Sequence, residues 1–389
     1  MTRIAVVTVA RSDYGLYRPF LKALDADPAF ELNLIVAGMH LMPQFGRTIE
    51  EIEADGFEAA AKVDLAQGGD RPIDVAAAMG RGTIGFAEAY ARIRPDLVVV
   101  HGDRFEMHAA AVAAVPFLIP IIHHDGGALT LGAIDDALRH SMTKLASLHF
   151  VETEAYAARV IQMGEEPWRV TVTGALGLDN LVDVAILAPE AFQARFGVPL
   201  QPGRPPLLAT FHPVTREYAE TRVHMEAFLA AIDESGLPVV FTYPNADTGG
   251  QVIIEMIEAF VDRHTEAWAV PHLGTQGYFS LMANAAAMVG NSSSGIIEAA
   301  SFKLPVVNIG CRQEGRLAPD NVTTTGSTKA EIFQGIRKAV SPEFRASLAS
   351  LVNPYGDGHA AERMMTVLRD TDPKDPRLIR KTFHDLPRP

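Results

Sequence analysis

Short runs of apolar and β-branched residues alternate along the chain with longer, alanine-rich stretches of helical length. In the first half, the apolar runs are 4–9, 32–37, 97–100, 119–122 and 148–151, and stretches such as 73–94 and 105–115 separate them. This alternation predicts a parallel sheet covered by helices. The fully apolar run at 97–100 is typical of a central strand that is buried on both faces.

A stretch rich in proline and glycine interrupts the alternation, which then restarts. We expect further strands at 206–210, 239–242, 268–270, 286–289 and 305–309, and helices at 216–233, 251–263, 277–284 and 295–302. The predicted organisation is an N-terminal Rossmann-like domain over 1–186, a linker region over 187–205, a C-terminal nucleotide-binding Rossmann-like domain over 206–370, and a tail over 371–389 that packs on the surface or frays. Two doubly wound α/β domains in series predict a cleft, with ligands beyond the carboxyl ends of the strands.

Charge and composition narrow the classes of partner. The 389 residues include 34 Lys and Arg against 47 Asp and Glu, a net charge of −13. Because a nucleic-acid binder needs a basic face, we expect no nucleic-acid partner. The single cysteine cannot form an internal disulfide, no apolar run is long enough to span a membrane, and the chain enters a strand pattern at once. We therefore expect a cytoplasmic protein with no membrane partner.

Charged residues follow two of the expected strands in the first domain. Arg11 comes after the strand at 4–9, in a motif that is not a dinucleotide fingerprint, so a nicotinamide cofactor has no support. Asp103 and Arg104 follow the strand at 97–100 across Gly102. Asp103 is a candidate base or orienting group, and the two arginines are candidate anion clamps. The structural alternatives are an N-cap by Asp103 and a solvent-exposed Arg11.

The densest cluster of candidate residues is the stretch 123–140. It contains His123, His124, Asp125, Asp135 and Asp136 around several glycines, which is typical of an active-site loop. The spacing of these residues matches no common zinc pattern, so we expect no metal. Asp135 is also a plausible helix cap.

The second domain offers a histidine and a donor-rich turn. His212 follows the strand at 206–210, either at the cleft or as a structural histidine. The turn at 290–295 supplies amide and hydroxyl donors for a diphosphate from Asn291, Ser292, Ser293, Ser294 and Gly295. Glu298 is placed to reach a ribose, unless it is simply exposed, and the segment 312–316, with Arg316, adds cations.

The order of these motifs resembles the hydrolysing UDP-N-acetylglucosamine 2-epimerases. The resemblance covers about Arg3 to Tyr355 and rests on the motifs at 101–104, 126–140 with 143–144, 211–213, 245–249, 290–295, 312–316 and 321–322. It implies a glycosyltransferase-B-like architecture, no cofactor and a homo-oligomer, either dimer or tetramer. It also implies elimination of UDP to a glycal, followed by hydration to a free manno-configured amino sugar. The substrate would be UDP-GlcNAc or a UDP-2,4-diacetamido-trideoxy sugar of the sialic or legionaminic acid pathways.

The resemblance also implies roles for single residues. The implied nucleotide contacts are Arg11, Arg104, Ser292, Ser293, Glu298 and Arg316. The implied catalytic groups are His40, Asp103, His123, Asp135, Asp136 and His212. Among the carboxylates, Asp103 is the preferred base for the C2 proton.

One position departs from the family pattern. Ala128 stands where the family's loop reads Gly-Gly-Glu, and a methyl group cannot move a proton. Three explanations stay open: an introduced inactivating change, a neighbour such as Asp125 or His124 that has taken over, or a different sugar or step. The alternatives to a hydrolysing enzyme are therefore a non-hydrolysing epimerase, a glycosyltransferase of the same fold, and an inactive nucleotide-sugar binder.

Overall fold

The computed structural model divides the chain into two compact units. Unit 1 comprises Met1–Asn180 and Tyr355–Pro389, and unit 2 comprises Leu181–Pro354. The residues that the structure describes are 1–42, 48–66, 68–69, 71–131, 134–201, 203–214, 220–244, 250–271 and 273–386.

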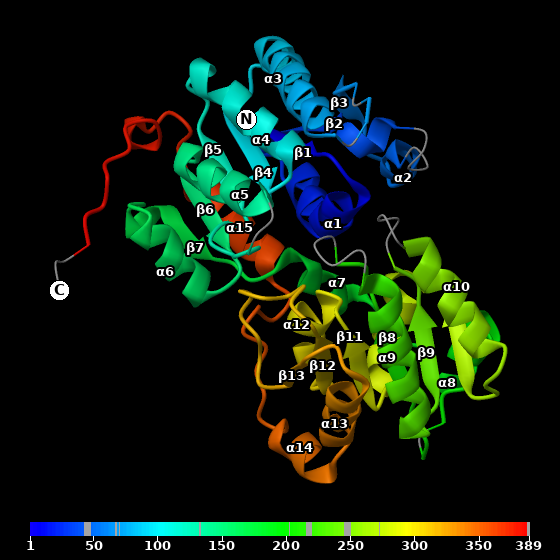
Figure 1. Ribbon diagram of the computed structural model, residues 1–389. Coiled ribbons are helices and arrows are strands. Elements are labelled where there is room, and N and C mark those ends of the chain that lie inside the picture. The colour runs from blue at the N-terminus through cyan, green and yellow to red at the C-terminus, as the bar shows by residue number, and fades with distance from the viewer. Residues whose placement is uncertain are drawn as a thin grey trace. The chain divides into compact units, whose positions relative to one another are not determined.

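A seven-stranded parallel sheet forms the centre of unit 1 (Figure 1). Its strands are β1 (Thr2–Thr8), β2 (Phe30–Ala37), β3 (Ala59–Val63), β4 (Leu97–His101), β5 (Ile121–His124), β6 (Leu148–Val151) and β7 (Val170–Val172). They lie in the order β3-β2-β1-β4-β5-β6-β7. The direction of sheet growth reverses between β1 and β4. Ligands of doubly wound sheets bind beyond the carboxyl ends of the strands at such a point.

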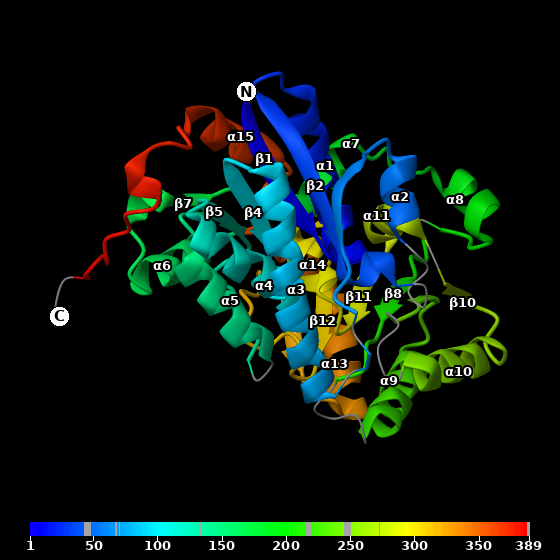
Figure 2. The same ribbon diagram turned by 90° about the horizontal axis from the view of Figure 1, so that it is seen from above.

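Alternate side chains of this sheet pack into two cores, one on each face. Ile4 and Val6 belong to the core formed with α1 (Arg11–Ala26), α2 (Ile49–Ala54) and α15 (Ala360–Asp370). Ala5 and Val7 belong to the core formed with α3 (Pro72–Ile93), α4 (Phe105–Ala114) and α5 (Ile134–Leu145). Figure 2 shows α3 and α4 lying side by side. Burial on both faces explains why the central strands are continuously apolar.

Unit 2 repeats the same strand order with six parallel strands. They are β8 (Leu207–Thr210), β9 (Val239–Thr242), β10 (Ala267–Val270), β11 (Ala287–Gly290), β12 (Val306–Ile309) and β13 (Val322–Thr325), in the order β10-β9-β8-β11-β12-β13. One face packs against α9 (Thr221–Ser235), α10 (Gly250–Val261) and α13 (Lys329–Ala339), and the other against α8 (Pro189–Phe196) and α11 (Gly274–Asn284). The remaining α-helices are α6 (Glu154–Gln162), α7 (Asp179–Asp183), α12 (Ser294–Ile297) and α14 (Pro342–Ser347).

The expectation of two Rossmann-like α/β domains is confirmed, with differences at the sheet edges. The strands β3, β7 and β13 were not predicted, and each lies at an edge. Their side chains are largely half-buried or exposed, so they lack the apolar run that marks a central strand. The predicted strand at 119–122 is shifted to Ile121–His124, and the helix expected at 295–302 is the short α12 followed by a 3₁₀ turn, Ala299–Phe302.

The C-terminal segment also differs from the expected boundary at residue 370. Helix α15 belongs to unit 1, because Met364, Met365 and Leu368 fill the core beside α1. Asp179 accepts hydrogen bonds from the N–H groups of Ala360 and Ala361 at the start of this helix, at 2.8 and 2.6 Å. The segment that follows contacts unit 1 as far as Lys381: Arg169 donates to the Arg377 carbonyl at 2.7 Å, and Lys381 donates to the Ala146 carbonyl at 2.5 Å.

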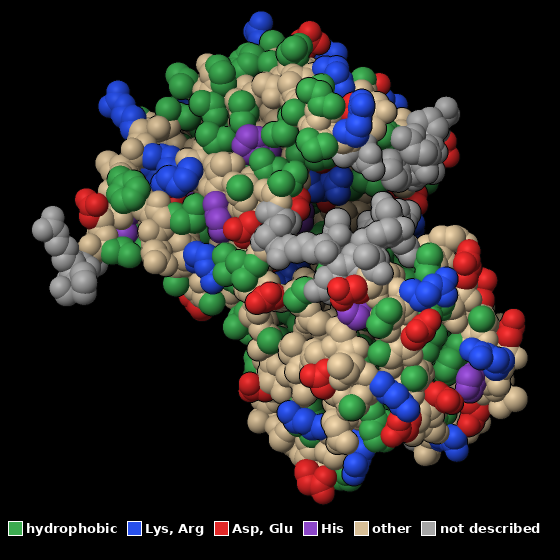
Figure 3. Space-filling model, viewed as in Figure 1, with side chains coloured by type: hydrophobic (Ala, Val, Ile, Leu, Met, Phe, Trp, Pro, Cys, Tyr) green, Lys and Arg blue, Asp and Glu red, His purple; other side chains and the backbone are tan. Residues whose placement is uncertain are grey.

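The surface of unit 1 has an exposed apolar area on α3 and on the 3₁₀ turn Val115–Phe117 that follows α4. Its members are Ile73, Ile84, Val115, Phe117 and Leu118, each more than 40% exposed. Figure 3 shows apolar side chains gathered over this part of the unit. Within the described ranges, no helix is both long enough and apolar enough to cross a membrane.

Candidate active site

An ion pair between a half-buried aspartate and a buried arginine lies just beyond the end of β4. Gly102 adopts a φ of +69°, which turns the chain, and Asp103 follows it. The Asp103 carboxylate pairs with Arg139 of α5, whose side chain is only 3% exposed. Burial raises the pKa of Asp103, and the negative charges of Asp125 and Asp135 raise it further. The positive charge of Arg139 opposes this rise. Asp103 is thus a carboxyl group that can hold a proton beside a fixed cation.

The loop after β5 is held in an unusual backbone conformation. Asp125 has a φ of +69°, and its N–H donates to the carbonyl of Phe150 at 2.9 Å. Gly127 has a φ of +82°, and a Cβ there would lie 2.4 Å from the carbonyl oxygen of Tyr156. Arg159 donates to the Gly127 carbonyl. These contacts fix Asp125 at the carboxyl end of the sheet, and they leave Ala128 6% exposed.

The two adjacent aspartates of α5 have different surroundings. Asp136 accepts from the N–H of Thr130 at 2.8 Å and lies 3.6 Å from His140. Asp136 therefore fixes the loop that precedes the helix. In the part of the chain that the structure describes, the half-buried Asp135 carboxylate has no hydrogen-bond partner, yet its negative charge contributes to the raised pKa of Asp103. Asp135 is the more available of the two.

Two predicted catalytic histidines are buried and neutral. His123 lies with Nε2 2.9 Å from the Gly102 carbonyl and Nδ1 3.1 Å from the Thr143 hydroxyl. Burial lowers its pKa to about 3. His40 is held by the hydroxyls of Thr8 and Thr48 at 2.9 and 2.7 Å, and burial lowers its pKa to about 4. These bonds use both nitrogens of each ring for positioning the strand ends.

The two predicted anion clamps of unit 1 are unequally held. Arg104 donates to the buried carboxylate of Glu106 at 2.9 and 3.2 Å, which fixes its guanidinium near the end of β4. Arg11 is largely exposed and lies 3.5 Å from Glu51. Arg104 is therefore the preorganised cation of this pair.

In unit 2, Asn291 ties together three loops at the carboxyl ends of the strands. Its side chain accepts from the N–H of His212 at 2.7 Å and donates to the His212 carbonyl at 2.8 Å. Its own carbonyl accepts from Arg312 and Gln313 at 3.0 and 2.9 Å. The Asn291 side chain, predicted to contact the nucleotide, is thus occupied within the protein. His212 is buried, and burial together with Arg312 lowers its pKa to about 3.

The turn after Asn291 places polar groups around a buried carboxylate. Ser292, Ser293 and Ser294 are half-buried, and the N–H of Ser294 donates to the Ser292 hydroxyl at 3.4 Å. Burial raises the pKa of Glu298, opposed by Ser294 and Arg316. Its buried Oε2 has no hydrogen-bond partner among the described residues, so it is an acceptor available to a ligand hydroxyl.

Two further residues of these sites had no assigned role in the sequence analysis. Arg139 lies four residues after Asp135, which places both on one face of a helix, so this spacing was a usable signal. Tyr278 lies on α11. Burial raises its pKa to about 12, and hydrogen bonds with Ser294, Thr210 and Ser292 partly offset this rise. No local pattern marks Tyr278. The motif at 245–249 lies outside the described residues.

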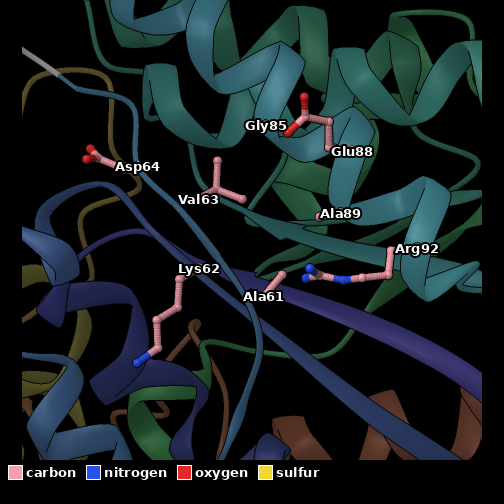
Figure 4. Close-up of a pocket in the computed structure, with 8 residues that line it drawn as sticks. All are labelled: Ala61, Lys62, Val63, Asp64, Gly85, Glu88, Ala89 and Arg92. Atoms are coloured by element: carbon pink, nitrogen blue, oxygen red, sulfur yellow. The ribbon is translucent and has the colours of Figure 1, made fainter.

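A groove of about 230 Å³ lies against the edge strand β3 (Figure 4). Its eight lining residues come from 61–64 and from the second half of α3, and all of them differ from the predicted site residues. Nearby, Arg92 donates to the Ala60 carbonyl at 3.1 Å, which covers an open acceptor of this edge. Across the described ranges, no group of three or more His, Cys, Asp or Glu residues is arranged to hold a metal ion.

Comparisons with known proteins agree on one family. The family model described as UDP-N-acetylglucosamine 2-epimerase matches residues 22–369. A UDP-N,N'-diacetylbacillosamine 2-epimerase (hydrolyzing) of Legionella pneumophila is 37% identical over 94% of this chain and 95% of its own. A GDP/UDP-N,N'-diacetylbacillosamine 2-epimerase (hydrolyzing) of Campylobacter jejuni is 35% identical over 88% of each chain. The crystal structure of UDP-GlcNAc 2-epimerase from Neisseria meningitidis shares the fold, with a TM-score of 0.81 at 17% identity over 95% of this chain and all of the other.

Proposed function

Because the chain belongs to the UDP-N-acetylglucosamine 2-epimerase family, we propose that it is a hydrolysing 2-epimerase of a UDP-linked 2-acetamido sugar. The products are UDP and the free manno-configured sugar. The observation that carries the proposal is the identity of 37% and 35%, over most of the chain, to two relatives named as hydrolysing 2-epimerases. The pair of half-buried Asp103 with buried Arg139 supports it, since removal of a C2 proton requires a base.

In this proposal, unit 1 carries out the proton chemistry. Asp103 takes the C2 proton, and Arg139 and Asp135 set the ionisation of Asp103. His123 and Asp136 hold the strand end and the loop in place. The raised pKa of Asp103 suits a group that must release the proton again during the cycle.

Unit 2 binds the nucleotide. The hydroxyls and backbone N–H groups of Ser292, Ser293 and Ser294 donate hydrogen bonds to the diphosphate, and the Oε2 atom of Glu298 accepts one from a ribose hydroxyl. The charge of Arg316 opposes the rise in the pKa of Glu298, and it also adds positive charge for the phosphates. Asn291 holds the turn that carries these groups beside His212 through two hydrogen bonds to the His212 backbone.

The preferred substrate is the UDP-linked 2,4-diacetamido sugar, because two relatives at 35–37% identity carry that substrate in their names. UDP-GlcNAc is the second candidate, on the basis of a Neisseria meningitidis UDP-N-acetylglucosamine 2-epimerase that is 31% identical over 88% of the chain.

Nuclear magnetic resonance of the reaction products, measured with each substrate, distinguishes the two substrates and the type of reaction. Free UDP and a free manno sugar are expected. A 2-epimer that retains UDP contradicts hydrolysis, and UDP release only on addition of an acceptor indicates a glycosyltransferase.

Ala128 supports one competing function, an inactive nucleotide-sugar binder. The Ala128→Glu substitution tests it. If the wild type is a dead binder, the wild type binds the UDP-sugar without turnover, and the variant gains activity. If the wild type is the enzyme proposed here, it turns over, and a glutamate at a position that is 6% exposed lowers the activity because its carboxylate must be buried.

We also propose that the chain forms a homo-oligomer through the exposed apolar area of α3 and the Val115–Phe117 turn. Contiguous apolar surface on a protein marks an interaction site. The Ile84→Asp substitution, at a side chain that is 63% exposed, should shift the mass measured by light scattering toward the monomer. Val223→Asp, equally exposed on α9 of unit 2, is the matched control and should leave the mass unchanged. Equal masses for Ile84→Asp and wild type would argue against this interface.

A further inference from the structure

Two histidines at the ends of β4 and β5 form a pair that the roles above leave unused. His101 and His124 are register partners in adjacent parallel strands. Their rings stack at 4.9 Å with an interplanar angle of 18°, and their Nδ1 atoms lie 2.7 Å apart. At this distance one nitrogen must donate a proton and the other must accept it.

Which ring donates depends on the tautomers of the two rings. His124 is 1% exposed, and burial, with the charges of His101 and His123, lowers its pKa well below the usual value, so the ring is neutral and carries one N–H. The Nε2 atom of His124 has no hydrogen-bond partner among the described residues, although the Gly174 carbonyl favours a proton on the ring. With that proton on Nε2, Nδ1 of His124 has a lone pair that can accept from His101.

The tautomer of His101 follows from that of His124. When Nδ1 of His124 accepts, Nδ1 of His101 carries the shared proton, and Nε2 is the nitrogen of His101 that is left for a substrate. Tyr17 of α1 packs edge-on against the ring, with centroids 5.4 Å apart, which restricts its orientation. His101 is half-buried, whereas His123 and His124 are buried. Of these three histidines, His101 is the one a substrate can reach.

We propose that His101 is a second proton-transfer residue of unit 1 and that His124 is the positioning residue that fixes its tautomer. The proposal rests on the proposed 2-epimerase reaction. Inversion at C2 requires a proton to leave one face of the sugar and another to arrive on the opposite face, so one carboxylate in one place is not sufficient. His101 is separated from Asp103 by a single glycine, and positive charge on His101 favours the ionised form of Asp103. The surrounding titratable and charged groups are Tyr17, Asp103, His123, Asp125 and Arg139.

The two residues divide the reaction as follows. In the elimination, Asp103 takes the C2 proton, the C–H electron pair forms the C1–C2 double bond, and the C1–O bond breaks with its electrons passing to UDP. In the hydration, a water oxygen bonds to C1, the His101 imidazolium gives its Nε2 proton to C2, and the proton lost by the water returns to His101. The Asp103 proton then leaves to solvent, which balances the negative charge gained by UDP.

Imidazole nitrogen spectra of the full chain, labelled with ¹⁵N-histidine, test the positioning without substrate. We expect the neutral His101 ring to carry its proton at Nδ1. The His124→Leu variant should lose this preference, while His124→Asn, whose amide oxygen can take the place of Nδ1, should keep it. A wild-type spectrum with a bare Nδ1 on His101 overturns the assignment, and so does a His124→Leu spectrum identical to wild type.

The activity test separates the two steps. His101→Asn should release UDP at close to the wild-type rate but form free sugar about 10²–10⁴-fold more slowly, so that the acetamidoglucal accumulates. His124→Leu should lower kcat about tenfold or more with little change in KM, because the His101 ring loses the partner that orients its proton. His124→Asn should restore kcat. His108→Gln, on α4, is the matched control and should behave as wild type.

The outcomes distinguish this proposal from the proposed function. Equal losses of UDP release and sugar formation in His101→Asn, without glycal, overturn the role of His101. Absence of UDP release by the wild type overturns the 2-epimerase function instead, and the nitrogen spectra then still decide whether His124 fixes the tautomer of His101.

Discussion

At the scale of single residues, the ionisation of Asp103 depends on the cation beside it. Removing that cation in Arg139→Met should raise the pKa of Asp103 further, because burial is then unopposed. Fewer molecules carry the basic carboxylate at neutral pH, so the acidic limb of the kcat–pH profile should move to higher pH, with about a 10²-fold loss at pH 7. Arg139→Lys, which keeps the charge, is the control and should retain the position of the limb. An unshifted limb in Arg139→Met would show that Asp103 is not the titrating base.

The sequence predicted the position of Asp103 better than its chemistry. An aspartate after a buried strand is expected at the ligand-binding edge of the sheet. Its ion pair joins residues 36 positions apart, and no local pattern encodes the burial that raises its pKa. Asn291 illustrates the same limit. Its place in a donor-rich turn suggested a nucleotide contact, whereas its amide is used by His212, which lies 79 residues away.

At the scale of elements, the end of β11 requires glycine. Gly290 has a φ of +143°, and a Cβ there would lie 1.8 Å from the Thr210 carbonyl of the neighbouring strand. Gly290→Ala should therefore lower the free energy of unfolding by about 3 kcal/mol or more and weaken UDP binding, because β8 and β11 must separate. Gly203→Ala, where a Cβ meets nothing within 4 Å, is the control and should change stability by less than about 0.5 kcal/mol. Denaturant unfolding of both variants, with UDP titration, measures the difference, and equal stability would refute the steric argument.

The C-terminal tail is fixed to unit 1 by a buried carboxylate. Glu165 is fully buried and lies 3.0 Å from His149, 2.5 Å from Lys144 and 2.7 Å from Lys381 of the tail. Burial opposes ionisation of Glu165, but the bonds to His149 and the two lysines outweigh it and lower its pKa to about 2. The stabilisation from this carboxylate is therefore complete above the unfolded-state pKa of about 4.5 and is lost as the pH falls toward 2.

Lys381→Met removes the tail's contribution to this cluster. It should lower stability by about 1–3 kcal/mol at pH 7, and the deficit should shrink as the pH falls from 4.5 toward 2, where Glu165 becomes protonated. Thermal unfolding across this pH range measures the effect. Lys374→Met, in the same tail, is the control. A deficit that does not vary with pH would mean that Lys381 acts through packing and not through the charge of Glu165.

The pattern along the chain predicts best the central strands, which are buried on both faces. Strand β9 has the bounds that the pattern predicts, because its four residues, Val-Val-Phe-Thr, form a buried, apolar and β-branched run between turns. Strand β3 reads Ala-Ala-Ala-Lys-Val, which has no strand-like alternation, and only its place at the sheet edge makes it a strand. The membership of α15 in unit 1 is likewise set by long-range packing against α1, which a pattern along the chain does not contain.

At the scale of the whole molecule, each unit has the strand order of a Rossmann fold, and each brings its candidate residues to the carboxyl ends of the strands. Unit 1 gathers carboxylates, a buried arginine and histidines, which suit proton transfer. Unit 2 gathers hydroxyls and a carboxylate with a free acceptor oxygen, which suit a nucleotide. The central claim of the proposed function is that the C2 proton is removed as UDP is eliminated and replaced as water is added.

Isotope incorporation from solvent tests that claim most directly. The protein is incubated with the UDP-linked diacetamido sugar in D₂O enriched in ¹⁸O, and the sugar product is analysed at once by mass spectrometry and proton resonance. Elimination followed by hydration predicts a free manno sugar with deuterium at C2 and ¹⁸O at C1. A free sugar that keeps its original hydrogen and configuration at C2 would contradict the account, as would a deuterated sugar still attached to UDP.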